Sequence, residues 1–375
     1  MRIVGLIAVV AALGASVPAG AATDLERWKQ EASEISITRD DWGIAHVHGR
    51  TDADAVFGAI YAQDEDDFRR VEMNYLTALG RVAEAKGESA LWQDLRQRLF
   101  IDPDVLKADY AKSPDWLKRL MNSWADGMNF YLATHPDVKP LAIAHYEPWM
   151  ALSFTEGSIG GDVEDAKLPA LAAFYGKTKL GMVDDGDREA RGSNGIAIAP
   201  ARSADGHALL LINPHVTFFF RSELQMTSDE GLDAYGASTW GQFFIYQGFN
   251  RDIGWMHTST GVDNVDEFAE TVETRNGKTS YRYGGAWRPL GIRTITLRYA
   301  NGAAAKTRTF TTYYTGHGPI VRADGDKWIA LALMNRPIEA LEQSFQRTKA
   351  HDLASYMKVA ALQANSSNNT VFADS

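Results

Sequence analysis

The chain has 375 residues, 45% of them hydrophobic and 11% aromatic, so it can bury a substantial core in one large domain or in two or three smaller ones. Its formal net charge of -10 argues against nucleic acid as a partner, because binding a phosphate backbone requires a basic surface. The absence of cysteine excludes disulfides, cysteine nucleophiles and thiolate metal sites together.

The first 21 residues have the pattern of a secretory signal peptide. Arg2 supplies the positive end, residues 3–13 form an apolar core too short to span a bilayer, and Ala19-Gly20-Ala21 resembles a cleavage site. A buried N-terminal helix is the alternative interpretation. We therefore predict an exported protein, periplasmic or secreted, and no membrane span, because no other apolar run is long enough.

Residues 22–165 are predicted to form a mainly helical scaffold after two short strands. A turn separates the two strands, and Asp52 is the expected N-cap of the first long helix. Apolar side chains recur at helical spacing in each helical segment. The expected elements are strands 35–38 and 44–47, helices 52–80 and 113–135, and a helical stretch that begins at Glu147.

The segment 166–192 differs from its surroundings, because lysines and an acidic run at 184–189 replace the apolar pattern, and we interpret it as a solvated, mobile linker. From Ser193 onward, short alternating runs separated by Gly and Asp turns indicate a largely antiparallel layer. The expected strands are 194–199, 208–213, 243–249, 279–283, 292–299, 307–314 and 327–333, with a helix at 353–364. Helices before Ser193 and strands after it predict the α+β fold class.

Gly192-Ser193 joins this polar segment to an apolar strand and is a bond that the chain itself could cut. Glycine adds no side-chain bulk, and the serine hydroxyl can attack the preceding carbonyl. A cut before Ser193 would leave a free α-amine, whose ordinary pKa of about 8 lets it take the proton from its own hydroxyl. From these residues alone, a turn that leads into a strand is the alternative interpretation.

Several separated motifs follow one another in a fixed order. They are Arg39-Asp40-x-Trp42-Gly43-Ile44-x-His46-Val47, Gly80-Arg81-x-Ala83-Glu84, Ser193-Asn194, Asn213-Pro214-His215, Trp255-Met256-His257-Thr258-Ser259 and Asn369-Thr370-Val371-Phe372-Ala373-Asp374. This ordered set resembles the penicillin acylase and acyl-homoserine-lactone acylase family of N-terminal-nucleophile hydrolases. The resemblance covers nearly the whole chain, and an ordered set is more specific than any one motif.

The resemblance implies the αββα sandwich of this superfamily, with Ser193 at the start of a central strand. It implies a helical first chain of residues 22–165, a spacer of residues 166–192 that is excised, and a β-rich catalytic second chain of residues 193–375. The upstream end of the spacer stays open, between about 165 and 180. The two processed chains would remain together as a heterodimer. Members of the family are much longer, so the second chain is expected to be incomplete at its C-terminus.

Each matching position carries an implied catalytic role. Ser193 is the nucleophile, and His215 is expected to hydrogen-bond its amino group and to adjust the pKa of that amine. The backbone N–H of Ser259 and the side chain of Asn369 would hold the oxyanion, with Asn368 as the alternative if the register slips by one. Many relatives have Val or Ala at the position of Ser259, a difference that a backbone donor tolerates.

Three further positions are implied to act in self-cleavage or in substrate binding. Asn194 follows the nucleophile and is expected to assist the cut or to hold the substrate amide. Val216 and Phe218 follow His215, where the family places side chains of the acyl pocket.

Asp263-Asn264-Val265-Asp266 matches a calcium-binding loop of the penicillin acylases. The resemblance assigns the ligands to the carboxylates of Asp263 and Asp266 and to the carbonyl of Val265, a donor set that suits a hard cation. It also implies an acidic ligand from the first chain, for which Glu164 is the candidate. Such an ion would be structural, because the expected chemistry requires no metal or other cofactor.

The implied function is a self-processing N-acyl amide hydrolase that acts on acyl-homoserine lactones, penicillins or related small N-acyl compounds. The closing motif looks closer to acylases that accept fatty acyl chains, which favours acyl-homoserine lactones. Three alternatives stay open: an exported β-rich binding protein, an inactive truncated acylase homologue, and a Ser-x-x-Lys hydrolase built on Ser355 and Lys358, whose partner motifs are absent.

Overall fold

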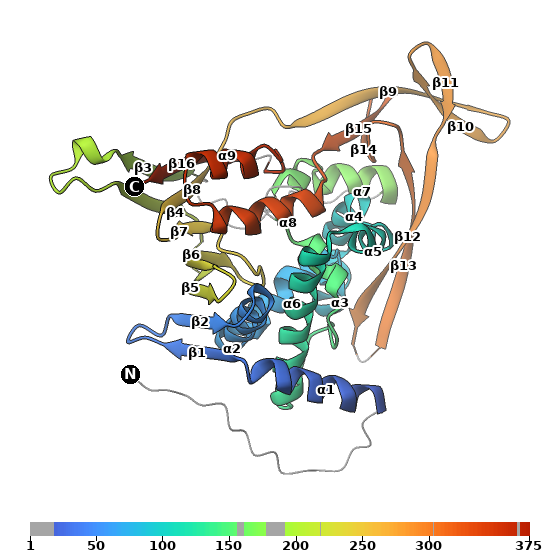
Figure 1. Ribbon diagram of the computed structural model, residues 1–375. Helices are drawn as coiled ribbons and strands as arrows, with labels where there is room; N and C mark the ends of the chain where they lie inside the picture. The colour runs from blue at the N-terminus through green and yellow to red at the C-terminus, as the bar shows by residue number, and fades with distance from the viewer. Residues whose placement is uncertain (1–18, 156–160, 178–191, 218, 303, 366–367) are drawn as a thin grey trace.

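The computed structural model describes residues 19–155, 161–177, 192–217, 219–302, 304–365 and 368–375 (Figure 1). Helices dominate before residue 177 and strands after residue 192, which confirms the predicted α+β class. The α-helices are α1 (Ala19–Ala32), α2 (Asp52–Ala78), α3 (Val82–Lys86), α4 (Leu91–Phe100), α5 (Pro103–Lys112), α6 (Asp115–Thr134), α7 (Leu168–Gly176), α8 (Pro337–Gln346) and α9 (Leu353–Ala360). The 3₁₀ helices are η1 (Glu88–Ala90), η2 (Pro148–Ser153), η3 (Gly161–Asp165), η4 (Pro200–Arg202) and η5 (Arg347–Lys349).

The strands form one large sheet, one distal sheet and two hairpins. They are β1 (Ile35–Arg39), β2 (Ala45–Gly49), β3 (Gly192–Ile198), β4 (Leu209–His215), β5 (Arg221–Ser228), β6 (Asp233–Thr239), β7 (Gln247–Phe249), β8 (Ile253–Ser259), β9 (Val265–Arg275), β10 (Lys278–Tyr283), β11 (Ala286–Pro289), β12 (Gly291–Asn301), β13 (Ala304–Tyr314), β14 (Ile320–Asp324), β15 (Lys327–Leu333) and β16 (Asn368–Asp374). The large sheet has the order β1-β2-β5-β6-β7-β8-β16 and the distal sheet the order β11-β10-β9-β15-β14. The pairs β3–β4 and β12–β13 are antiparallel hairpins.

Helices cover one face of the seven-stranded sheet. A Cβ added to Gly58 of α2 would lie 2.6 Å from Cγ1 of Val47 on β2, so this helix packs directly on the strand. At the other end of the sheet, the ring of Tyr356 in α9 lies 4.7 Å from that of Phe372 on β16. The cross-strand partners place Val47, Trp255 and Phe372 on the same side of the sheet, which we call the helix face.

The hairpin β3–β4 packs on the opposite face of the same sheet, over β8 and β16. A Cβ added to Gly195 would lie 2.8 Å from Cγ2 of Val371 and 3.0 Å from Sδ of Met256, and one added to Gly254 would lie 2.6 Å from Cδ2 of Leu210. Only glycine permits so close an approach of the two layers at these points. The order helix, sheet, hairpin matches the α, β and β layers of the predicted αββα sandwich. We call the hairpin side of the sheet the site face.

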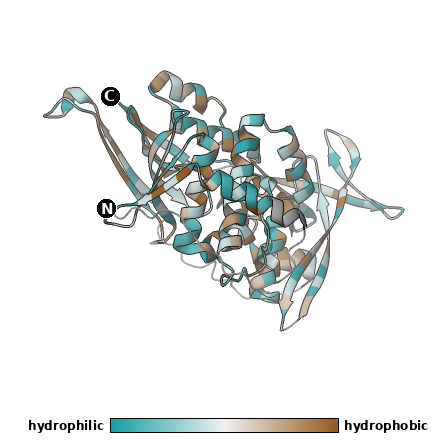
Figure 2. Cartoon of the chain, turned by 60° about the horizontal axis from the view of Figure 1, so that its bottom comes forward, coloured by the Kyte–Doolittle hydropathy of each residue, from teal (hydrophilic) through white to brown (hydrophobic). Residues whose placement is uncertain are grey.

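The outward side of this hairpin is apolar and exposed. Ile196, Ile198, Leu209 and Leu211 are 53%, 37%, 47% and 48% exposed. Figure 2 shows hydrophobic stretches along the projecting hairpin. The inward-facing residues alternate with these four, and all of them except Ala197 are partly buried against the sheet.

Segments on both sides of Gly192-Ser193 share the large sheet and its core. Strand β2, from before this bond, pairs in parallel with β5, from after it, and Val47 lies opposite Met226. Both side chains are 1% exposed. Parallel strands need a long crossover connection, and here it contains helices α2 to α7 and the hairpin β3–β4.

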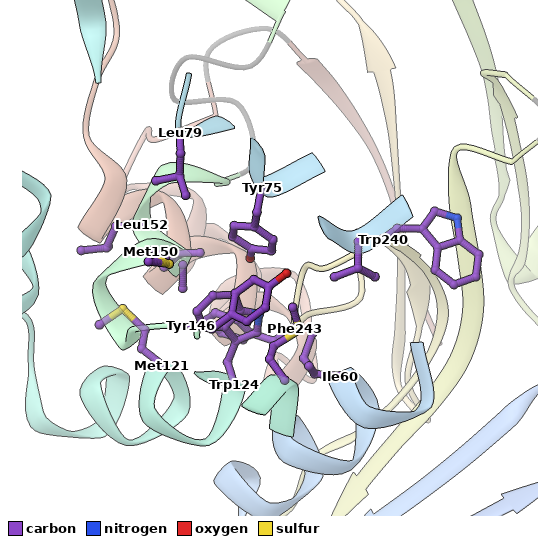
Figure 3. Close-up of a cluster of buried hydrophobic side chains, with 14 of the residues drawn as sticks. Ile60, Tyr75, Leu79, Met121, Trp124, Tyr146, Met150, Leu152, Trp240 and Phe243 are labelled. Atoms are coloured by element: carbon purple, nitrogen blue, oxygen red, sulfur yellow. The ribbon is translucent and has the colours of Figure 1, made fainter. Parts of the chain in front are cut away.

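The loop 240–242, between β6 and β7, is inserted against helices α2 and α6. Gln63 donates to the loop backbone at 3.0 Å and accepts from it at 2.8 Å, and Asn74 donates to it at 2.9 Å. The hydroxyl of Tyr75 and the indole of Trp124 donate to one loop carbonyl at 2.9 and 3.1 Å. Figure 3 shows Tyr75 and Trp124 within this buried cluster. Side chains of the helical segment therefore satisfy buried backbone groups of the β-rich segment.

Helix α2 begins where the sequence predicts, but its N-cap is Thr51 and not Asp52. The hydroxyl of Thr51 accepts from the backbone N–H of Asp54, and the Asp54 carboxylate accepts from the N–H of Thr51, which forms a reciprocal capping box. Asp52 instead accepts hydrogen bonds from Ser228 and Lys349 and joins the helix to the β-rich segment.

The expectation of a solvated linker is wrong for its first part. Residues 168–176 form α7, in which Leu168 and Leu171 are buried. The hydroxyl of Tyr175 donates to the carbonyl of Ile320 at 2.6 Å, so this helix packs against β14. Residues 178–191 lie outside the described residues, and the interpretation of that part as a spacer stays a prediction.

Several other elements differ from the sequence-based expectation. The expected strand 243–249 is a strand only at 247–249, because residues 243–245 belong to a buried loop. The helical stretch expected at Glu147 is the short 3₁₀ helix η2. Helix α8 and the strands β5, β6, β8, β9, β11, β14 and β16 are elements that we did not predict.

Residues 1–18 of the predicted signal peptide lie outside the described residues. Helix α1 begins at Ala19, inside the predicted cleavage motif. In the part of the chain that the structure describes, no helix combines the length and the apolar character needed to cross a membrane.

Candidate active site

Ser193 is the second residue of β3 and faces the seven-stranded sheet. It is partly buried and lies opposite Pro214 in the hairpin, while Gly192 lies opposite His215. The Oγ atom of Ser193 accepts a hydrogen bond from the backbone N–H of His215 at 3.2 Å. The hairpin register therefore fixes the position of the predicted nucleophile.

The ring of His215 lies on the other side of the hairpin. Because side chains alternate along a strand, His215 shares the outward side with Asn194 and Asn213. Its Nε2 atom lies 2.7 Å from Oδ1 of Asn213 and 3.4 Å from Nδ2 of Asn194. The structure thus brings the backbone of His215, and not its imidazole, to the hydroxyl of Ser193.

Ser259 and Asn369 lie on neighbouring strands, as an oxyanion pair requires. In the antiparallel pair β8–β16, Asn369 lies opposite Thr258, and Asn368 lies opposite Ser259. Asn369 shares the site face with Val371, the residue that contacts the hairpin. Asn368 lies on the helix face and donates to another residue, so the structure favours Asn369 over the alternative.

The direction in which β3 crosses the sheet follows from the two glycine contacts. Leu210, which contacts Gly254, is the hairpin partner of Ala197. Moving from Gly195 to Ala197 along β3 therefore corresponds to moving from Met256 to Gly254 along β8. The two strands run in opposite directions across the layers.

This direction places the predicted catalytic groups at one end of the layers. Two residues before Gly195 is Ser193, and two residues after Met256 is Thr258, whose partner is Asn369. A hydroxyl nucleophile, an amide donor and the adjacent backbone of Ser259 are the groups that acyl transfer needs.

The turn after β4 carries the predicted acyl-pocket residues. Val216 is 36% exposed, while Phe218 lies outside the described residues. The carbonyl of Phe219 accepts from the indole of Trp240 at 3.0 Å, and the guanidinium of Arg70 lies 5.4 Å from the Phe219 ring. Trp240 and Arg70 therefore contact the turn that follows β4, and neither residue was expected from the sequence.

The predicted calcium loop, which connects β8 to β9, lines a cavity of about 450 Å³ together with residues of α7, β14 and β15. Asp263 and Val265 contribute to this cavity together with Asp165, Lys167 and Arg322. Lys167 pairs with Asp165 at 3.3 Å, and Arg322 pairs with an acidic residue of β9 at 2.7 Å. Two cationic side chains therefore already neutralise carboxylates at the cavity wall.

The other implied ligands do not join this group. Neither Asp266 nor Glu164 lines the cavity, and it is Asp162 that reaches the loop, by accepting from Asn264 at 2.8 Å. Within the described ranges, no three acidic or histidine side chains converge as a metal site requires. The residues as placed do not fit a calcium ion, so calcium stays a prediction and no chemistry below depends on it.

Ser355, the serine of the rival Ser-x-x-Lys motif, has a structural role. Its hydroxyl donates to the carboxylate of Asp352 at 2.6 Å, and its backbone N–H donates to the same carboxylate at 2.7 Å. The second of these bonds, together with the backbone N–H of Asp352 that donates to Oγ of Ser355 at 3.1 Å, forms the capping box of α9. Ser355 is therefore occupied as a helix cap.

Three curated relatives are similar to most of this chain. They are the acyl-homoserine lactone acylase QuiP of Pseudomonas fluorescens (26% identical over 341 residues, 78% of this chain and 41% of the relative), the acyl-homoserine lactone acylase PvdQ of Pseudomonas putida (25% over 396 residues, 94% and 50%) and the penicillin acylase 2 proenzyme of a Pseudomonas species (25% over 373 residues, 84% and 47%). The chain spans at most about half the length of these relatives.

This chain is similar to a solved structure, the thermostable penicillin G acylase of Alcaligenes faecalis. The match covers 48% of this chain and 32% of the solved chain, with 19% identity and a TM-score of 0.39. The family profile described as penicillin amidase matches residues 34–375. That match covers both the helical segment and the β-rich segment with Ser193, His215, Ser259 and Asn369. The chain therefore belongs to the penicillin amidase family.

Proposed function

We propose that this chain is part of an N-acyl amide hydrolase that cuts itself before Ser193 and then uses Ser193 as its nucleophile. The observation that carries the proposal is the position of Ser193 in a strand that leads to the same end of the layers as Ser259 and Asn369. Membership of the penicillin amidase family supports an amide substrate. The printed name proenzyme of one relative is consistent with a chain that is processed.

Self-cleavage would begin at the Gly192-Ser193 bond. The Oγ atom of Ser193 attacks the carbonyl carbon of Gly192, the C–N bond breaks as an ester forms, and the proton of the hydroxyl ends on the released amine. Water then hydrolyses the ester and leaves a Gly192 carboxylate and a free Ser193. The N–H of His215, which already donates to Oγ, orients the hydroxyl for this attack.

Amide hydrolysis would use the same oxygen and the new amine. The amine of Ser193 accepts the hydroxyl proton, Oγ attacks the substrate carbonyl, and the departing amine takes that proton as the acyl ester forms. The N–H of Ser259 and the side chain of Asn369 stabilise the negative oxygen of each tetrahedral intermediate. Water releases the carboxylic acid and regenerates Ser193.

The substrate, the processed state and the location form part of the same proposal. Two of the three relatives are named acyl-homoserine lactone acylases, and this agrees with the fatty-acyl character of the closing motif. We propose acyl-homoserine lactones as the first substrates to test and penicillins as the second. We also propose that the protein is exported and that its two processed chains stay together as a heterodimer. The shared sheet and the loop 240–242 support the heterodimer, because they join the two segments without the cut bond.

The deciding experiment is intact mass spectrometry with N-terminal sequencing of the purified protein. We expect one chain that begins Ser193-Asn194-Gly195 and, if export occurs, another that begins near Ala22. Ser193→Ala should remain uncut and should release no amine from N-octanoyl-homoserine lactone. Ser355→Ala, which removes a hydroxyl from a helix cap, should mature and hydrolyse normally.

Two results would reject the proposal. A Ser193→Ala protein that still matures and hydrolyses the lactone would show that another residue is the nucleophile. An unbroken wild-type chain without activity would favour the alternatives of an exported binding protein or an inactive homologue.

A further inference from the structure

Asn369 lies near the start of β16, the last strand in the order of the seven-stranded sheet, and its neighbour Asn368 carries the same side chain. Successive side chains of a strand point to opposite faces of a sheet. A shift of β16 by one residue along β8 would therefore bring Asn368 to the site face in place of Asn369. Both side chains carry the same amide donor, so their chemistry alone does not determine which of them faces the oxyanion.

Alternate residues of β16 have partners on the helix face. Asn368 donates through Nδ2 to Oδ1 of Asn365 at 2.9 Å. Thr370 places Oγ1 3.0 Å from Nδ1 of His257 on β8, its direct partner across the two strands. The ring of Phe372 lies 4.7 Å from an aromatic ring of α9. These three contacts leave the intervening Asn369 directed to the site face.

His257 is a firm anchor for this arrangement. Its side chain is buried, with the residue only 2% exposed. The ring of Tyr246 lies 5.2 Å away and nearly perpendicular to it, and the carbonyl of His257 accepts from the Gln247 amide at 2.8 Å. Thr370 is β-branched, so its side chain has few rotamers once the hydroxyl is bonded. The buried imidazole of His257 therefore holds the side chain of Thr370 and, through it, the Thr370 backbone in place.

We propose that the His257–Thr370 pair fixes the register of β16 and so positions Asn369, rather than Asn368, as the oxyanion donor. Both are positioning residues, because their side chains lie on the opposite face of the sheet and do not touch the reacting atoms. The inference rests on the proposed function and adds two residues to its machinery. An oxyanion donor must be held within a fraction of an ångström of its productive position, and a displacement of about 1 Å can lower the rate by about 10²-fold.

A double-mutant cycle tests this inference. Thr370→Val keeps the shape of the side chain and removes the hydroxyl. We expect it to mature normally and to lower kcat for N-octanoyl-homoserine lactone by about 10-fold to 10²-fold, with KM nearly unchanged. In an Asn369→Ala background the same substitution should have no further effect on kcat, because the residue through which it acts is gone.

Two variants keep the test independent of folding. Thr370→Ser retains the hydroxyl, and we expect its kcat to stay within about 2-fold of wild type. Thr296→Val is the matched control, because Thr296, like Thr370, is an exposed strand threonine, and its hydroxyl lies 3.2 Å from Oγ1 of Thr309, its direct partner across the hairpin β12–β13. It should change the melting temperature about as much as Thr370→Val and leave kcat unchanged.

Several outcomes would overturn the inference. They are an unchanged kcat in Thr370→Val, an effect that adds fully to that of Asn369→Ala, and a kcat for Thr370→Ser as low as that for Thr370→Val. Failure of the proposed function looks different. In that case no chain begins at Ser193, or Asn369→Ala itself keeps full activity.

Discussion

The two faces of the seven-stranded sheet are made by the same strands and have opposite roles. On the helix face, Val47, Trp255 and His257 are at most 2% exposed. On the site face, which the hairpin covers only over β8 and β16, Phe249 is 50% exposed and Asn369 is exposed. The difference teaches that the helix face mainly holds the packed core and the site face mainly holds the exposed groups, so neighbouring substitutions should mostly act on different properties, and the His257–Thr370 pair is the proposed link between the two faces.

The largest expected effect is on the helix face. Trp255→Ala should destabilise the fold by about 3–5 kcal/mol, because it opens a cavity and leaves the Tyr246 carbonyl without the indole donor. Urea unfolding followed by circular dichroism measures this loss. Phe249→Ala, on the half-exposed site face, is the control and should cost about 1 kcal/mol or less. Equal losses for the two variants would refute the division by face.

The second effect concerns a titratable group within the helical layer. Burial is the main cause that raises the pKa of Glu31 to about 7, while a hydrogen bond from Ser123 lowers it. The folded pKa lies above the unfolded value, so the stabilising contribution is complete below the unfolded pKa and is lost as the pH rises through about 7.

Glu31→Gln should therefore be more stable than wild type at pH 8.5, by up to about 3 kcal/mol, and nearly equal to it at pH 4. Urea titrations at the two pH values provide the measurement. Glu34→Gln, the same substitution at an exposed position next to α1, is the control. A Glu31→Gln protein that gains nothing at pH 8.5 would show that this carboxylate is solvated in the fold.

A third prediction concerns the packing of the hairpin β3–β4 against the seven-stranded sheet. Gly195→Val would force atoms against Val371 and Met256, whose contacts with a new Cβ are already 2.8–3.0 Å. We expect about 1–3 kcal/mol of destabilisation and a complete loss of self-cleavage, because Ser193 moves away from the oxyanion donors. Mass spectrometry detects the uncut chain. Gly261→Ala, where a Cβ meets nothing within 4 Å, controls for the loss of glycine. Normal maturation of Gly195→Val would contradict the layer packing.

The smallest effect is expected on the outward side of the hairpin. Ile196→Thr and Leu211→Ser replace exposed apolar side chains and should change the free energy of unfolding by less than about 0.5 kcal/mol. Thermal melting of the two variants and of the wild-type protein measures the change in stability. A loss of 2 kcal/mol or more in either variant would mean that these side chains are covered in solution.

Sequence reasoning identified the elements whose pattern is local. The capped helix α2, the hairpin strands β3 and β4 and the α+β order follow from periodicity and turn residues. It missed β8 and β16 as strands although both contain quoted motifs, because β8 is buried on both faces over Ile253–His257 and β16 groups its polar and apolar residues, so neither shows a simple alternation. It also placed the cap of α2 at Asp52, since threonine and aspartate at the adjacent positions 51 and 52 compete for the same role.

The site was accessible from the sequence only in part. Motif order predicted Ser193 and Asn369 as site residues, but the direction of the His215 ring depends on the register of the hairpin β3–β4, which the motifs do not specify. The contacts of Trp240 and Thr370 depend on tertiary packing and leave no local signature. The calcium ligands were placed by likeness to a loop, whereas their convergence depends on the path of the chain between β8 in the large sheet and β9 in the distal sheet.

The parallel pairing of β2 with β5 has a consequence for the lifetime of the processed protein. While the chain is continuous, unfolding and refolding are unimolecular and independent of concentration. Once the bond before Ser193 is cut, the sheet contains strands from two molecules, and its recovery after unfolding becomes a second-order encounter. Processing would thus convert a reversible fold into one whose persistence depends on its unfolding rate, so that heat inactivation at low concentration is permanent.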